Sequence, residues 1–196
     1  SLVLTLDTRQ QQLAQQALQW AMKAAGLKRG VVIVMNPRTG EVLALFPGSR
    51  PQEIARHTRD FAEVARELVR RRPGLTVVIG LAPGVTLDPA ALPFRTVSSA
   101  SFDVLRAADV ALCKSGTTTL EAAIAGCPCA IVYRINPVTF AILKRLVRIP
   151  HIGLVNIVAG REVAPEFVQD AFVPTRVADA LEPLFAADGA PRRAMC

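Results

Sequence analysis

The stretch Val42-Leu43-Ala44-Leu45-Phe46-Pro47-Gly48-Ser49-Arg50 joins a short apolar run to a proline–glycine turn. Directly after it, residues 51–72 are predicted to form a long amphipathic helix, because apolar residues recur there at helical spacing. An apolar strand that passes through a tight turn into such a helix is typical of α/β proteins with a parallel sheet.

Strands and helices alternate through the rest of the chain. The predicted strands lie at residues 75–79, 110–113 and 129–133, and helices are predicted at 101–107 and 137–148. A tight loop at residues 115–119 is predicted to open a further helix that ends at about residue 125. One short strand and one or two helices are expected after them. This alternation predicts an α/β fold, a Rossmann-like parallel sheet with helices on both faces.

Residues 1–44 have a different pattern. Residues 2–6 predict a strand, and a Gln- and Ala-rich helix is expected to follow to about residue 25. Two apolar runs, 31–35 and 41–45, flank a turn-rich segment and predict a hairpin. The predicted organisation is a segment, a domain and a polar tail, at residues 1–44, 45–187 and 188–196.

Composition limits the classes of function. A chain of 196 residues that is 51% hydrophobic can bury a sizeable core, which excludes disorder for most of it. Aromatic residues make up only 5%, so no nucleic-acid partner is expected. The net charge of +7 suits anionic partners in general, which are nucleotides, phosphates, nucleic acid or an anionic membrane surface, and does not select one of them. Cys113, Cys127 and Cys129 are expected to be reduced core thiols, which indicates a cytoplasmic location.

Two corners between a strand and a helix carry candidate anion-binding groups. In the first, the amides of Gly48 and Ser49 precede the helix, and Arg50 adds a guanidinium suited to phosphate. In the second, Ser115-Gly116-Thr117 opens a helix in which Glu121 can face a ribose diol. An ordinary turn with a solvated arginine, and an ordinary helix cap, are the alternative interpretations.

Two further segments can meet a ligand. Tyr133-Arg134 ends a strand, and the basic residues after it form either a phosphate- or membrane-facing surface or a solvated helix face. Asn156 lies in an apolar loop between glycines, where it contacts a sugar or satisfies its own loop backbone. His57 is expected to face solvent. No metal-ligand spacing is present, no cofactor is expected, and no catalytic residue is identified.

In chain order, these segments resemble the lipid-A-disaccharide synthase family over about residues 43–187. The succession of motifs is specific, although each motif alone is weak. The motifs are Leu45-Phe46-Pro47-Gly48-Ser49-Arg50 with Glu53, Ala108-Asp109 with Ser115 to Glu121, Tyr133-Arg134 with Thr139-Phe140 and Lys144 to Val147, and Asn156 to Glu162 with Pro165-Glu166 and Gln169.

The resemblance implies the donor-binding half of a two-domain, GT-B type glycosyltransferase. Such an enzyme transfers 2,3-diacylglucosamine from UDP to 2,3-diacylglucosamine 1-phosphate with inversion and releases UDP, in the cytoplasm or at the inner face of the cytoplasmic membrane. The implied partners are the UDP-2,3-diacylglucosamine donor and the acylated sugar-phosphate acceptor, and a homodimer is allowed. The implied contacts are Gly48, Ser49, Arg50, Ser115, Gly116 and Thr117 for the diphosphate, Glu121 for the ribose, and Tyr133, Arg134 and Asn156 for the donor.

The chain departs from the family in its first part. The acceptor domain with the expected general base is missing, and residues 1–44 resemble the opening of a penicillin-binding-protein transpeptidase domain without its S-x-x-K motif. We therefore expect two joined fragments that meet at residues 42–45, and an inactive donor-binding fragment. The alternatives are a non-enzymatic cell-wall interaction module and another UDP-sugar enzyme, such as an epimerase.

Overall fold

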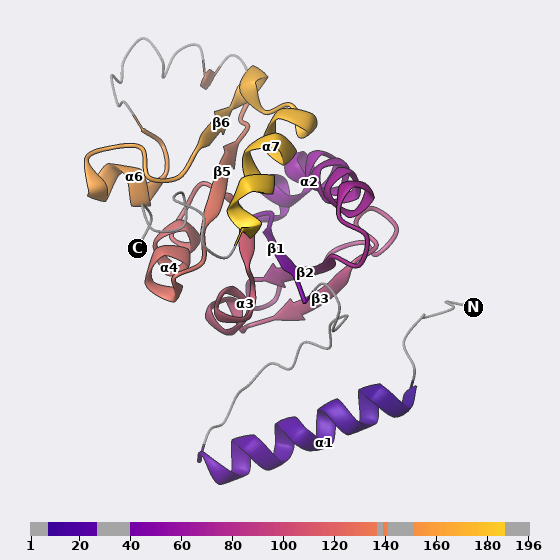
Figure 1. The fold of residues 1–196 in the computed structure, drawn as a ribbon. Coiled ribbons are helices and arrows are strands. Elements are labelled where there is room, and N and C mark those ends of the chain that lie inside the picture. Colours follow the sequence, from indigo (N-terminus) through magenta and orange to yellow (C-terminus); the bar gives the residue numbers. More distant parts are fainter. Residues whose placement is uncertain (1–7, 27–39, 137–138, 141–150, 187–196) are drawn as a thin grey trace.

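The computed structural model describes residues 8–26, 40–136, 139–140 and 151–186. Its centre is a parallel six-stranded sheet with the strand order β3-β2-β1-β4-β5-β6 (Figure 1). The strands are β1 (Val42–Phe46), β2 (Thr76–Leu81), β3 (Arg95–Ser98), β4 (Val110–Lys114), β5 (Cys129–Tyr133) and β6 (Glu166–Val168). The predicted α/β fold with a parallel sheet is confirmed.

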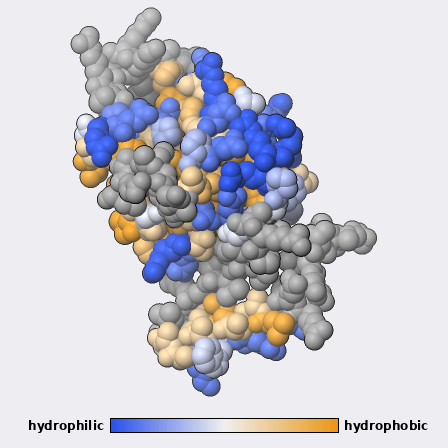
Figure 2. Space-filling view, viewed as in Figure 1, coloured by the Kyte–Doolittle hydropathy of each residue, from blue (hydrophilic) through white to orange (hydrophobic). Residues whose placement is uncertain are grey.

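Helices other than α1 cover both faces of this sheet. The helices whose bounds the structure describes are α1 (Thr8–Ala24), α2 (Pro51–Arg71), α3 (Ser101–Ala107), α4 (Thr118–Ala125), α6 (Leu154–Ala159) and α7 (Pro174–Leu181), with 3₁₀ turns η1 (Gln169–Ala171) and η2 (Glu182–Phe185). α2 and α7 pack on one face, whereas α3, α4 and α6 share the other. Figure 1 shows α1 apart from this assembly, and Figure 2 shows mainly hydrophilic residues at the surface over α2.

The central strand β1 explains why the core has two halves. Successive side chains of a strand point to opposite faces. Leu43 and Leu45 therefore pack with α2 and α7, while Val42 and Ala44 pack with the helices of the other face. Every residue of β1 is buried, which is the reason that the strand reads as one continuous apolar run.

The predicted hairpin between residues 31–35 and 41–45 is wrong. β1 pairs in parallel with β2 along one edge and with β4 along the other, so neither edge is left for an antiparallel partner. The predicted boundary between residues 44 and 45 falls inside this strand. The strand predicted at residues 2–6, the tail from residue 188 and most of the helix predicted at 137–148 lie outside the described residues.

A buried polar cluster fastens the segment around α6, which was predicted as a loop. The Asn156 side chain is fully buried, and its Oδ1 accepts hydrogen bonds from the amides of Val163 (2.8 Å) and Ala164 (2.9 Å). Its Nδ2 donates to the Ala164 carbonyl and to Glu166 Oε1, both at 2.7 Å. Glu166 also accepts the amides of residues 152–153. Of the two interpretations of Asn156, the structure therefore matches the one in which it satisfies its own loop.

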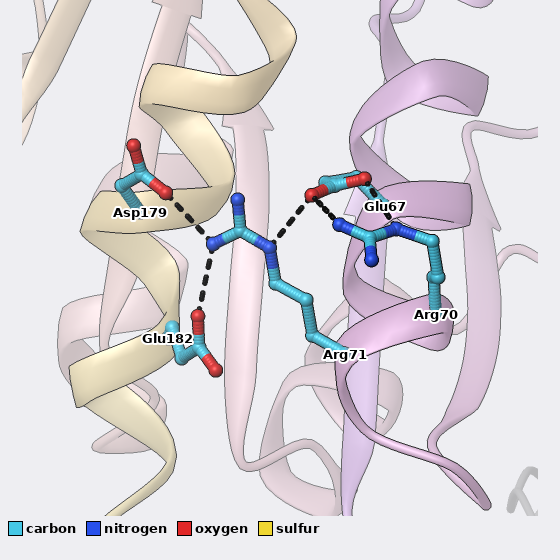
Figure 3. A network of polar contacts seen from close by, with 5 residues as sticks. All are labelled: Glu67, Arg70, Arg71, Asp179 and Glu182. Atoms are coloured by element: carbon cyan, nitrogen blue, oxygen red, sulfur yellow. Dashed lines mark hydrogen bonds and ion pairs between the residues drawn. The ribbon is translucent and has the colours of Figure 1, made fainter.

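An ion-pair network joins α2 to α7 (Figure 3). Nη1 of Arg71 lies 2.7 Å from Asp179 Oδ1 and 2.9 Å from Glu182 Oε2, and its Nε lies 2.8 Å from Glu67 Oε1. Arg70 binds the same Glu67 carboxylate. Hydrogen bonds from Arg70 and Arg71 lower the pKa of Glu67 to about 2. The network fixes the last turn of α2 against α7 and the start of η2.

We predict that Glu67→Gln lowers the melting temperature at neutral pH and flattens its dependence on acid. A carboxylate whose folded pKa is depressed adds stability above its unfolded pKa of 4.5, and this stability is lost as pH falls toward about 2. Circular-dichroism melting across that window measures the effect. Glu63→Gln, which breaks a more exposed pair with Arg59, is the control. A Glu67→Gln protein with the parent's pH dependence would contradict this assignment.

Asn156→Ala should destabilise the fold by about 2–3 kcal/mol, because it leaves the amides of Val163 and Ala164 without their acceptor and removes one of the hydrogen bonds to Glu166. Urea unfolding measures the change in the free energy of unfolding. The exposed Glu162 of the same segment supplies the control, since Glu162→Ala should stay within about 0.5 kcal/mol of the parent. Equal stability of the two variants would show that the cluster does not anchor this segment.

Candidate active site

The strand order places a crevice at the carboxyl ends of β1 and β4. The chain adds β2 and β3 on one side of β1 and then crosses over to add β4 on the other. Phe46 pairs with Cys113, so the two strands end side by side. The helices that follow them, α2 and α4, pack on opposite faces of the sheet. Connections that diverge in this way leave the space in which α/β proteins bind ligands.

A cavity of about 390 Å³ opens at this crevice. Both predicted corners contribute to its wall, so Gly48 and Gly116 share one hollow although 68 positions separate them. The structure thus brings together seven of the ten predicted site residues. They are Gly48, Ser49, Arg50, Ser115, Gly116, Thr117 and Glu121.

The second corner offers backbone donors to this cavity. In the part of the chain that the structure describes, no acceptor is paired with the amides of Gly116, Thr117 and Thr118 at the start of α4. Ser115 contributes less than predicted, because its amide donates to the Val132 carbonyl (3.0 Å) and its hydroxyl to the Ile152 carbonyl (2.7 Å). Amide groups at a helix N-terminus favour an anion.

The first corner is organised by Glu53, which lies one turn into α2. Lys114 Nζ donates to Glu53 Oε1 at 2.9 Å, the Ser49 amide lies 3.4 Å from Oε2, and Arg50 Nη1 is 3.7 Å from Oε1. The sequence predicted a Ser49 amide that is free to bind an anion. In the structure this amide is instead bound to the Glu53 carboxylate. Burial raises the pKa of Glu53, yet these contacts outweigh it and the pKa is lowered overall, so Glu53 is ionised.

Gly48 is needed for this arrangement. Its φ of 128° lies in a region that side-chain-bearing residues rarely adopt, and a Cβ there would lie 3.0 Å from Glu53 Oε2. The glycine thus lets the carboxylate lie directly against the main chain of the turn.

Lys114 is a site residue for which the sequence had predicted no role. It ends β4, lines the cavity and places its Nζ 5.3 Å from the ring centroid of Tyr133. A lysine at the carboxyl end of a buried strand, directly before Ser115, is the signal that could have identified it.

Tyr133 and Arg134 line a neighbouring hollow of about 570 Å³, which shares Arg50 and Glu53 with the first. Arg134 is largely committed to the protein. Its Nη1 lies 2.7 Å from Asp60 Oδ2 and its Nη2 donates to the Phe172 carbonyl at 2.8 Å. The geometry therefore favours a structural role for Arg134 over the predicted donor contact.

His57 is buried, so the prediction that it faces solvent is wrong. Its Nδ1 donates to the Glu53 carbonyl at 2.7 Å, and its Nε2 accepts the Arg134 amide at 3.1 Å. Burial lowers the pKa of His57, which keeps the ring neutral in this bridge between α2 and the end of β5. Its spacing from Ile54 and Phe61 is that of a buried helix face and could have shown this.

Other expected features are distributed over the described residues as follows. Asn156 does not line either hollow. The three cysteines at positions 113, 127 and 129 are buried free thiols, as predicted, and the neighbouring Cys129 together with burial raises the pKa of Cys113. No group of three or more metal-ligating side chains occurs within the described ranges. None of the described helices is long and apolar enough to cross a membrane.

Comparison with solved structures places the fold among glycosyltransferases. The glycotransferase of kitacinnamycin aligns with a TM-score of 0.55 and 18% identity over 86% of this chain and 40% of that chain. The calicheamicin glycosyltransferase CalG4 aligns with a TM-score of 0.53 and 23% identity over 83% of this chain and 38% of that chain. At these identities the likeness concerns the fold, an open parallel sheet of the GT-B type.

Sequence comparison is more specific. The profile of the family described as lipid-A-disaccharide synthetase matches residues 23–190. Lipid-A-disaccharide synthases from Trichlorobacter lovleyi and Sodalis glossinidius are 41% and 42% identical over 145 and 152 residues, which is 70% and 72% of this chain but 38% and 40% of theirs. The relative from Pseudomonas aeruginosa strain LESB58 is 40% identical over 76% of this chain and 41% of its own.

The chain thus spans about two fifths of the length of the curated relatives that it matches. The profile starts inside the segment 1–44, and none of the comparisons supports the resemblance of that segment to a penicillin-binding protein, which stays a prediction. The profile covers most of the chain, and the matched residues form the described parallel sheet and its cavity. On these grounds, the chain belongs to the lipid-A-disaccharide synthase family.

Proposed function

We propose that this chain is the donor-binding half of a lipid-A-disaccharide synthase and that its cavity holds the diphosphate of a UDP-sugar. The observation that carries the proposal is the convergence of two corners on one cavity. Three amides at the start of α4 have no acceptor among the described residues. They line the same cavity as the cations Arg50 and Lys114. Amides at a helix end and fixed cations together favour a phosphate group.

The remaining wall suits the other parts of UDP. Glu121 lies one turn into α4, where its carboxylate can accept hydrogen bonds from both ribose hydroxyls. Phe46 and the small or apolar residues Gly80, Ala82 and Pro83 also line the cavity, and they offer apolar surface against which a planar base can pack. Tyr133 borders the neighbouring hollow and supports the sugar of the donor there.

The proposed reaction is inverting glycosyl transfer. The 6-hydroxyl oxygen of the acyl-glucosamine phosphate acceptor forms a bond to the anomeric carbon, while the bond from that carbon to the UDP oxygen breaks and its electron pair leaves with UDP. The amides of Gly116 and Thr117 and the cations at the cavity stabilise the charge that develops on the departing diphosphate. The proton of the hydroxyl passes to a base that we do not assign to this chain.

The location of this activity is also a proposal. A UDP-sugar donor and the net charge of +7 support work in the cytoplasm, at the anionic inner face of the membrane. There the lipid acceptor would be accessible to the half of the enzyme that binds the donor.

We predict that the chain binds UDP and that Arg50→Ala weakens binding about tenfold at low salt, because a guanidinium beside the diphosphate is lost. Isothermal titration calorimetry measures the affinity. Arg66→Ala, which removes an exposed arginine from the same helix outside both hollows, should leave it unchanged. No heat on titrating UDP into the parent chain would overturn the proposed function.

A second variant separates the two ends of the ligand. Glu121→Ala should weaken uridine and UDP by the same factor of about ten, because the ribose hydroxyls occur in both. Arg50→Ala should weaken UDP alone, since uridine lacks phosphate. If Glu121→Ala binds uridine as well as the parent does, the ribose is not held at this residue.

A further inference from the structure

The cavity wall contains carboxylates as well as cations. Among the charged side chains that line it are the cations Arg50 and Lys114 and the carboxylates Glu53 and Glu121, equal in number. A diphosphate brings at least two more negative charges to this balanced wall. Carboxylate and phosphate charges a few ångströms apart repel strongly in a partly buried site. We therefore expect one of the two carboxylates to lose contacts with its cationic partners when a phosphate binds.

Glu53 has the partners that a phosphate would take. Its carboxylate lies within hydrogen-bond distance of a backbone amide at a helix start and of an ammonium group, the Ser49 amide and Lys114 Nζ. It also pairs with the guanidinium of Arg50. Amide, ammonium and guanidinium are the three donor types that bind phosphate in proteins. The Lys114 and Glu53 side chains are only 15% and 18% exposed, so their pair is shielded from water.

From these contacts we infer that Glu53 is an internal substitute for a ligand phosphate, and that binding transfers Lys114 from Glu53 to the diphosphate. The inference rests on the proposed function, since it concerns the same cavity. Lys114 is suited to the exchange because its ammonium lies at the end of a flexible stem. It directly precedes Ser115 and the amides of α4, so a swing of the side chain moves its charge from the first corner toward the second.

The inference predicts an unusual effect of removing a cavity carboxylate. Glu53→Gln keeps the size of the side chain and an oxygen that accepts the Ser49 amide, but it frees Lys114 from its ion pair. UDP should therefore bind roughly tenfold more tightly to Glu53→Gln than to the parent. Uridine, which lacks phosphate, should bind both equally. If Glu53 had only a structural role in the first turn of α2, its replacement would not tighten the binding of UDP while leaving the binding of uridine unchanged.

Calorimetry with the full chain tests the exchange through four proteins: the parent, Glu53→Gln, Lys114→Met and the double variant. Lys114→Met should weaken UDP about tenfold, and the double variant should lose the gain of Glu53→Gln, because no ammonium is left to transfer. Glu63→Gln, an exposed carboxylate of the same helix outside both hollows, should match the parent.

The outcomes separate the two proposals. If the parent binds UDP and Glu53→Gln binds it equally or more weakly, the exchange is wrong and the proposed function stands. If neither binds UDP, the proposed function fails together with the exchange. Should Glu53→Gln not fold, the parent alone decides by NMR: the carboxyl carbon signal of Glu53 should shift with UDP and not with uridine, and equal shifts with both would overturn the exchange.

Discussion

The adjacency of β1 and β4 is the constraint on which the rest of the molecule depends. Two parallel strands end side by side, and their following helices turn to opposite faces of the sheet. The backbone amides and cations of two distant segments can meet in one cavity only because of this crossover. Outside the cavity, the Arg71 network holds α2 against α7, and the Asn156 cluster holds the segment around α6 against β6.

Those parts of the fold that are buried on both sides could be predicted from the sequence. β1 and β5 read as continuous apolar runs, and α3 was predicted with the bounds that the structure has. β3 was missed because it is a largely exposed edge strand whose polar residues carry no hydrophobic period; it exists because β2 offers a free edge. The hairpin was predicted from local turn signals, which cannot reveal that β1 has two parallel partners.

The candidate site was predictable where local geometry determines it. A glycine turn before a helix and a Ser-Gly-Thr turn before another are visible in the sequence. What the sequence could not reveal is which donors other groups already occupy. Ser115 binds the backbone of residue 152, and Glu53 binds a lysine 61 positions away, so both bonds depend on the completed tertiary structure. His57 shows the opposite case, because its helical spacing from Ile54 and Phe61 could have placed it on the buried face, although we predicted it to face solvent.

The central claim is that both corners act as one phosphate site, and amide NMR of the ¹⁵N-labelled chain tests it most directly. On titration with UDP, the amide signals of Gly116, Thr117 and Thr118 should shift together with that of Gly48, and all four should have the same midpoint. Shifts confined to one corner, or different midpoints at the two corners, would contradict a shared site.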